Sequence, residues 1–279
     1  MIQNIIFSIA KKEIMDNIRN KWIITITILF ASLTILASYA GSIFSEGWQD
    51  LGATISIMSS LVNFLITIIA LMLGYSTIVG EVERGSMSSL LTLPTNRLEI
   101  IIGKFVGLGL VLSFTILMGF GMAGIIISAN VPNVDYLEYL IFIGATILIG
   151  LVVLSIGILL SCLFQKRSTA MGGAIFIFFF FTIIWNFIVA AILIATGGLE
   201  TSGFGVVPDW FFAMNFFNPL SAYSSLVALN ISSVSVQQVG IYSSGYPSFY
   251  NSTNMLIALL IWLIVPLILA YWAFKSKDL

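Results

Sequence analysis

The residues with the most chemical character lie in one charged segment, 80–104, which separates two long apolar runs. Two acids and a base precede a glycine and a serine, and an apolar pair then opens a short helix that Pro94 ends or redirects. The segment is too short and too charged to cross a membrane, so it forms either a solvated turn or a small rigid surface for a partner. The residues that would form this surface are Glu81, Glu83, Arg84, Gly85, Ser86, Leu90 and Leu91.

The chain lacks the residues that enzymes and metal sites commonly use. It has no His, and its single cysteine, Cys162, has no partner for a disulfide within the chain. Its ten Met residues are dispersed, so we expect them to pack rather than to bind a soft metal. A phosphate-binding loop is missing, because Gly103 and Lys104 are followed by Phe105 and the position of the first glycine is Leu98. We therefore expect no catalytic residue, no cofactor or metal, and, at a net charge of −1, no nucleic-acid partner.

Five short sequences give the chain a resemblance to a known family. They are Gly-Glu-x-Glu-Arg-Gly-Ser at 80–86, Leu-Leu-x-x-Pro at 90–94, Gly-Lys at 103–104, a charged lead-in at 12–22 and Asn-Pro-Leu-Ser-Ala-Tyr at 218–223. Together they resemble the permease subunits of ABC-2 type transporters, over nearly the whole chain. The nearest likeness is to permeases associated with nitrous oxide reductase maturation, a copper-processing system.

This resemblance implies a permease that dimerises, with itself or with a similar permease, and binds two copies of a separate ABC-type ATPase subunit. ATP and Mg²⁺ would be bound by that partner, and closure of the ATPases would reach the membrane helices through a coupling helix. We expect residues 81–93 to form this coupling element, in which Ser86 caps a short helix. The three charged residues would orient the docking, while the two leucines would enter a groove of the ATPase.

The composition predicts a polytopic, all-α membrane protein with a single permease domain, 1–279. Hydrophobic residues make up 59% of the chain and charged residues 8%, which leaves too much apolar surface for a water-soluble fold. Six apolar runs are long enough to span a hydrocarbon layer as helices, and none has an ionisable Asp, Glu, Lys or Arg in its interior. They lie at about 22–42, 58–79, 105–128, 139–164, 172–196 and 255–274.

The distribution of charge predicts which side of the membrane each connection faces. All eleven Lys and Arg residues fall in four stretches, and the connections between those stretches carry only acidic charge. Because cytoplasmic connections collect cations, we expect the four stretches and both termini to be cytoplasmic in a plasma or inner membrane. The stretches are 11–21, 84–104, 166–167 and 275–277.

The N-terminal segment 1–21 places apolar residues near helical spacing, with charged residues largely opposite. This pattern predicts an amphipathic helix at the inner interface, with a simple charged tail as the alternative. The apolar run that follows has small residues at Ser38 and Ala40, as a cleaved signal peptide would. Its length favours a membrane span instead.

The outer segment 197–254 has no Lys or Arg, yet an aromatic stretch within it is too apolar to stand free in water. We expect one or two short re-entrant or interfacial helices over 206–230 that cap the bundle, and we favour packing over substrate contact for their aromatic rings. Asn230 and Asn251 in this segment match the acceptor pattern for glycosylation.

Few polar side chains lie inside the predicted spans. Asn63 and Asn186 are expected to form hydrogen bonds between helices, and glycine pairs such as Gly103 and Gly107 are expected to let helices pack closely. The uncharged spans disfavour an ion-gradient-driven carrier or a channel. The function predicted is therefore an ATP-driven exporter permease of unidentified substrate, with a non-transporting membrane scaffold for a cytoplasmic partner as the alternative.

Overall fold

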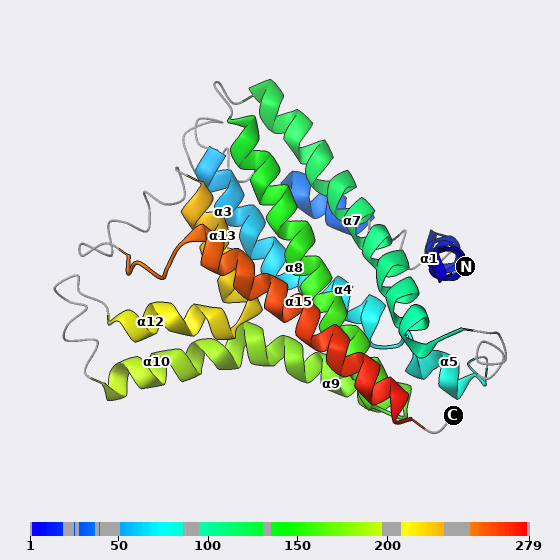
Figure 1. The fold of residues 1–279 in the computed structure, drawn as a ribbon. Coiled ribbons are helices and arrows are strands. Elements are labelled where there is room, and N and C mark those ends of the chain that lie inside the picture. The colour runs from blue at the N-terminus through cyan, green and yellow to red at the C-terminus, as the bar shows by residue number, and fades with distance from the viewer. Residues whose placement is uncertain are drawn as a thin grey trace.

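The computed structural model describes an all-helical chain, as predicted (Figure 1). The described residues are 2–18, 25, 28–36, 39, 51–85, 87, 95–130, 135–196, 208–231 and 246–277, and these ranges contain no β-strand. The helices are α1 Ile2–Ile18, α3 Leu51–Leu61, η1 Val62–Ile66, α4 Thr67–Gly74, α5 Val79–Glu83, α7 Arg97–Asn130, α8 Tyr136–Leu163, α9 Arg167–Phe179, η2 Phe180–Ile184, α10 Trp185–Ala195, α12 Asp209–Ala213, η3 Met214–Phe217, α13 Pro219–Asn230 and α15 Ser252–Lys275.

Five helical stretches among the described residues are long and apolar enough to cross a membrane. They correspond to five of the six predicted runs. Ten of the 21 residues of the remaining run, 22–42, lie outside the described residues, although its part 28–36 is helical, so this sixth span stays a prediction. The five stretches are Ile55–Glu83, Arg97–Ser128, Tyr136–Leu163, Arg167–Ala195 and Ser252–Lys275.

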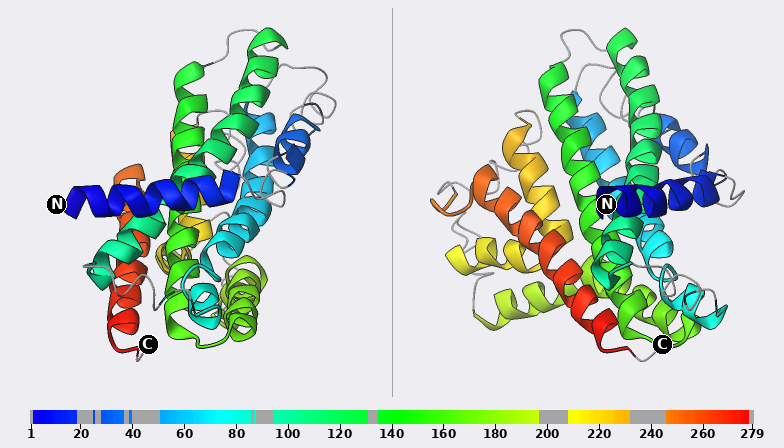
Figure 2. Two further views of the ribbon diagram at one scale, coloured as in Figure 1. Left: turned by 90° about the vertical axis from the view of Figure 1, so that its right-hand side faces the viewer. Right: turned by 45° about the vertical axis from the view of Figure 1, so that its right-hand side comes forward.

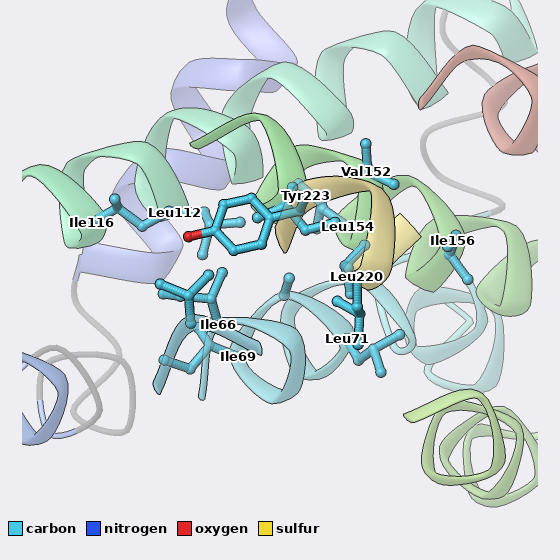
Figure 3. Close-up of a cluster of buried hydrophobic side chains, with 14 of the residues drawn as sticks. Ile66, Ile69, Leu71, Leu112, Ile116, Val152, Leu154, Ile156, Leu220 and Tyr223 are labelled. Carbon is cyan, nitrogen blue, oxygen red and sulfur yellow. The ribbon is translucent and has the colours of Figure 1, made fainter. Parts of the chain in front are cut away.

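Helix α8 is the most buried of these stretches and forms the centre of the bundle. It packs against α4, α7, α13 and α15. Figure 3 shows Leu220 and Tyr223 of α13 surrounded by apolar side chains of α4, α7 and α8. The Tyr223 hydroxyl lies 3.0 Å from Oγ1 of Thr146 on α8, so the polar end of this buried ring has a partner.

Helices α4 and α8 approach each other backbone to backbone. A Cβ atom built on Gly74 would lie 2.8 Å from the Cα of Gly157, closer than any side chain allows. In lipid, where burying apolar surface gives little drive for association, such small-residue contacts provide the close packing that holds helices together.

The predicted N-terminal helix is present as α1, which lies crosswise over α7 (Figure 2). A Cβ atom on Gly103 would lie 2.8 Å from the Cβ of Ile9, and one on Gly107 would lie 2.8 Å from the carbonyl oxygen of Ala10. The glycine pair therefore permits close packing, as predicted, and its partner is the N-terminal helix. Part of the apolar side of α1 is consequently covered by α7, while Phe7 remains exposed.

Two of the predicted spans are interrupted by π-helical turns, η1 and η2. Asn63, in η1, donates a hydrogen bond from Nδ2 to Oγ of Ser224 on α13 at 3.0 Å, which confirms the predicted contact between helices. For Asn186 the prediction was wrong, because its Nδ2 donates to the carbonyl oxygen of Thr182, four residues earlier in the same helical stretch.

The segment predicted as a cap contains the short helices α12, η3 and α13, which confirms short helices over 206–230; its placement on the outer side stays a prediction. Asn218 caps α13, since its Oδ1 accepts a hydrogen bond from the backbone N–H of Leu220 at 2.9 Å and Pro219 occupies the first turn. Its Nδ2 donates to the carbonyl oxygen of Phe181 in η2 at 2.9 Å. The Asn-Pro sequence thus fixes the cap to the interrupted helix.

Candidate coupling site at the cationic end

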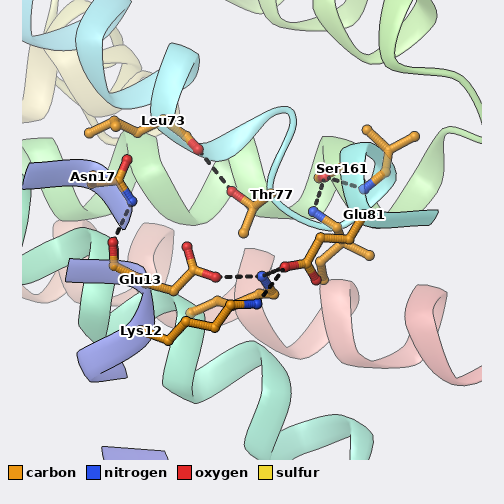
Figure 4. Close-up of polar contacts among 10 residues, drawn as sticks. Lys12, Glu13, Asn17, Leu73, Thr77, Glu81 and Ser161 are labelled. Atoms are coloured by element: carbon orange, nitrogen blue, oxygen red, sulfur yellow. Dashed lines mark hydrogen bonds and ion pairs between the residues drawn. The ribbon is translucent and has the colours of Figure 1, made fainter. Parts of the chain in front are cut away.

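An ion cluster around the buried Lys104 joins α1, α5 and α7. Nζ of Lys104 lies 2.6 Å from Oε1 of Glu13 and 2.9 Å from Oε1 of Glu81. Nζ of Lys12 lies 3.7 Å from the same Glu81 oxygen (Figure 4). The side chains of Lys104, Glu13 and Glu81 are 2%, 12% and 18% exposed, so solvent screens these pairs poorly. We name these four residues the ion cluster.

Helix α5 exists because the preceding span is broken and redirected. After Gly74 the chain forms a turn over 75–78, and the backbone N–H groups of Ile78 and Val79 donate to Oγ of Ser161 at 2.8 and 3.0 Å. These are N–H groups that a helix start leaves without a partner inside the helix. Ser161 of α8 therefore caps α5 and sets its direction.

The far end of α5 stops at Gly85, whose φ of +71° is the left-handed conformation that favours glycine at a helix terminus. Oε1 of Glu83 accepts a hydrogen bond from the backbone N–H of Arg167 at 2.7 Å, at the start of α9. A carboxylate in this place is favourable, because the helix N-terminus carries partial positive charge. Arg84, which lies between Glu83 and Gly85 in the sequence, is exposed.

The C-terminal helix also ends at this site. Nη1 of Arg97 donates to the carbonyl oxygens of Phe274, Lys275 and Lys277, with distances of 2.9 and 3.0 Å for the last two. Nζ of Lys277 donates to the carbonyl oxygen of Phe164, just after α8, at 2.6 Å. Partial burial lowers the pKa of the Lys277 ammonium below its ordinary value. Cations thus bind backbone carbonyls at the ends of α15 and α8.

These contacts bring the described parts of all four cationic stretches to one end of the bundle. The acidic connection at Asp135 begins α8, whose 28 residues span about 42 Å, and so lies at the opposite end. The grouping of the cations by the fold agrees with the pattern from which sidedness was predicted.

The predicted docking residues divide into three groups. Glu81 and Glu83 use carboxylate oxygens for contacts within the chain, to the ion cluster and to α9. Arg84 and Gly85 are exposed beside them. The roles predicted for the other three lie outside the described residues and stay predictions; they are Ser86, Leu90 and Leu91.

Sequence reasoning did not identify Glu13, Lys104 and Ser161 as members of the site. Glu13 and Lys104 each belong to one of the sequence motifs named above, and both lie at the predicted cytoplasmic ends of helices. This shared position is the feature of the sequence that could indicate their pairing. Ser161 carried no signal, because a serine inside an apolar run is ordinary.

The two glycosylation patterns lie at helix ends outside this site. Asn230 is the last residue of α13, and its Nδ2 donates to the carbonyl oxygen of Leu226 at 2.7 Å. Asn251 caps α15, with its Oδ1 accepting from the backbone N–H of Asn254 at 2.9 Å. Glycosylation of either residue stays a prediction.

Comparison with known proteins gives consistent results over the whole chain. A family model described as ABC-2 family transporter protein matches residues 7–279. A protein of Stutzerimonas stutzeri named "Probable ABC transporter permease protein NosY" is 33% identical over 280 residues, which cover 98% of this chain and 99% of the relative. A protein of the same name from Pseudomonas aeruginosa is 31% identical over 281 residues, with 99% of each chain covered.

Proposed function

The chain belongs to the ABC-2 family of transporter proteins, and we propose on that premise that it is an exporter permease energised by a separate ATPase. The family and the apolar helices make it a multi-pass membrane subunit of an ABC transporter. ATP and Mg²⁺ are bound by the ATPase, since the sequence has no phosphate-binding loop. The permease works as a dimer, with itself or with a similar permease, in a plasma or inner membrane.

The observation that carries this proposal is the way in which α5 is held. Its first turn is capped by Ser161, its middle is paired with α1 and α7 through Glu81, and its last turn caps α9 through Glu83. Its exposed end, Arg84 and Gly85, leads into the predicted docking segment. A force applied to that segment therefore acts directly on four helices.

Coupling by this route needs rigid connections. Charged groups that are poorly screened and in short contact resist separation more strongly than exposed pairs. The ion cluster meets this condition, because Lys104 is buried and contacts two carboxylates. The cluster serves as the joint through which ATPase closure moves α1 and α7 together.

The proposal is tested by purifying the permease with an ABC-type ATPase encoded beside it. We expect the wild-type permease to retain the ATPase and Arg84→Glu to retain about ten-fold less, because the charge that would orient the docking is then reversed. Lys275→Glu is the matched control, since Lys275 is an exposed cation at the same end of the bundle but lies on α15. Failure of the wild-type chain to bind any such ATPase would reject the proposal.

Sidedness is tested separately with thiol labelling. Cys162 is buried, so the natural chain provides a low background for membrane-impermeant reagents. Ser276→Cys, at the cationic end, should react only from the cytoplasmic compartment, and Tyr136→Cys, at the far end of α8, only from the outside. Reaction of both from the same compartment would refute the proposed topology.

A further inference from the structure

A cavity of about 560 Å³ lies in the half of the molecule away from the ion cluster. Its walls come from α3, η1, η2, α10, α12, η3, Asn218, α13 and residues 246–250. Asn63 in this wall precedes Glu81 of the ion cluster by 18 residues in the same spanning stretch. The volume falls in the range of pockets that hold small molecules.

The lining has an unusual chemistry for a membrane protein. The described lining residues are serines, asparagines, a threonine, tyrosines, phenylalanines and one leucine, and none of them is charged. Tyr246 and Tyr250 stack with their ring centroids 5.1 Å apart, and Phe212 meets Tyr250 edge-on at 5.1 Å. The cavity thus combines neutral hydrogen-bonding groups with an aromatic wall.

The same lining is poorly suited to ions. A bare charge taken out of water needs an opposite charge or a metal-binding ligand set to offset its lost hydration. The described wall has no carboxylate, ammonium, thiol or thioether. Hydroxyl and amide groups, in contrast, both donate and accept hydrogen bonds and so match uncharged polar molecules.

Both π-helical turns of the described chain contribute to this wall, Asn63 from η1 and Phe181 and Thr182 from η2. Such turns disturb regular helix bonding and often occur at functional sites. Here Asn218 donates to the carbonyl oxygen of Phe181 and so fixes one turn against the cap.

Two polar atoms of lining residues have no hydrogen-bond partner within the part of the chain that the structure describes. They are Oδ1 of Asn63 and Oγ1 of Thr182, and both are buried. Leaving a buried acceptor without a donor costs free energy. A ligand that supplies an O–H or N–H group, after a small rotation of either side chain, would remove that cost.

We propose that this cavity is a binding site for small uncharged molecules that donate hydrogen bonds, and that it excludes ions. The aromatic wall covers the apolar face of the ligand, while the amides and hydroxyls bind its polar groups. Binding is a property of the permease alone. Only the further statement that the bound molecule is the exported one rests on the proposed function.

The test uses a thiol placed in the cavity and three methanethiosulfonate reagents of similar size. Ser221→Cys lines the cavity on α13, and Cys162 is buried and adds little background. The reagents carry a 2-hydroxyethyl group, a trimethylammonium group or a sulfonate. Ser276→Cys, exposed at the other end, calibrates the intrinsic rate of each reagent.

We expect the hydroxyethyl reagent to modify Ser221→Cys about ten-fold faster than either charged reagent, after division by the Ser276→Cys rates. Its rate should saturate as the concentration rises, because reversible binding precedes the reaction. Adding Asn63→Leu should abolish the saturation by removing the acceptor. Adding Asn63→Asp should instead raise the rate of the cationic reagent. Thermal unfolding of each variant checks that it is folded.

Ser60→Cys, which lines the cavity from α3, provides a second position if the first variant does not fold. Similar calibrated rates for all three reagents, a rate that stays linear in the hydroxyethyl reagent, or no modification at either position would each overturn the proposal. None of these outcomes depends on the ATPase, so failure here leaves the proposed transport function unaffected.

Discussion

Replacing Lys104 by Met removes the cation that two buried carboxylates share while keeping a side chain of similar length. Glu13 and Glu81 then stand at the same place, 12% and 18% exposed, without the ammonium that lay 2.6 and 2.9 Å from them. Lys12 still lies 3.7 Å from Glu81 and compensates part of its charge. Glu13 is therefore the carboxylate that loses most.

The free-energy cost of Lys104→Met can be estimated from the cost of protonating one of the two carboxylates. A glutamate in water takes up its proton at about pH 4.3, so holding one carboxyl in its neutral form at pH 7 costs about 3.7 kcal/mol. The free energy of unfolding lost in Lys104→Met should not exceed this value by much, because the unpaired carboxylate can always bind a proton and become neutral. Removing one partner of a buried ion pair costs about 3–5 kcal/mol in other proteins, which agrees. We expect a loss of about 3–4 kcal/mol.

The assay is thermal unfolding of the purified permease, where such a loss lowers the midpoint by on the order of 5–10 °C. The triple variant Glu13→Gln, Glu81→Gln, Lys104→Met has no buried charge left at this place and should recover most of the loss. Its ATPase stimulation should nevertheless stay low if the ion cluster is the coupling joint. An unchanged midpoint in Lys104→Met, or a triple variant as unstable as the single one, would refute this reasoning.

Two further predictions concern α8. Ser161→Ala leaves two buried N–H groups at the start of α5 without an acceptor and should cost about 1–3 kcal/mol for each. Ser155→Ala should cost less in the same unfolding assay, because the Ser155 hydroxyl donates at 2.7 Å to the Val152 carbonyl of its own helix and reaches the Trp262 carbonyl of α15 only at 3.5 Å. Gly157→Ala forces a Cβ to within 3.0 Å of the α4 backbone and should cost about 1–3 kcal/mol, whereas Gly144→Ala meets no atom within 4 Å and should be tolerated. Equal midpoints within either pair would contradict the packing described.

Much of the architecture follows from the sequence because lipid imposes simple demands. A span needs an uninterrupted apolar run, and cations stay on one side, so five runs and the grouping of the cationic stretches could be read directly. The aromatic residues before Asn218 indicated short capping helices for the same reason, since they are too apolar to stand free in water.

The interruptions of the spans could not be predicted in this way. The π turns at 62–66 and 180–184 and the break at 75–78 have no proline, and the few polar residues within them, such as Asn63, Ser76 and Thr77, are of types that also occur in unbroken helices. Their cost is offset by distant groups, Ser161 for the break and Asn218 for the second π turn. Pairing of Glu13 with Lys104 likewise depends on how α1 crosses α7, which no local pattern specifies.

The two sites are connected by packing as well as by sequence. The stretch Ile55–Glu83 carries Asn63 in the cavity and Glu81 in the ion cluster, but the break at 75–78 prevents it from acting as one straight rod. The contact between Gly74 and Gly157 connects α4 to α8 before the chain reaches this break. The two backbones are in direct contact, so no flexible side chain lies between them to absorb a displacement.

From α8 the same displacement reaches the cap through buried contacts. Thr146 meets Tyr223 of α13 at 3.0 Å, and Ser221 and Ser224 of that short helix line the cavity. Ser224 also accepts the hydrogen bond from Asn63. The α13 part of the wall is therefore bound both to η1, through Asn63, and to α8, through Thr146. A movement of α5 against α8 must therefore either distort this wall or break one of the named contacts, which is the mechanical condition for coupling ATP hydrolysis to a change in the cavity.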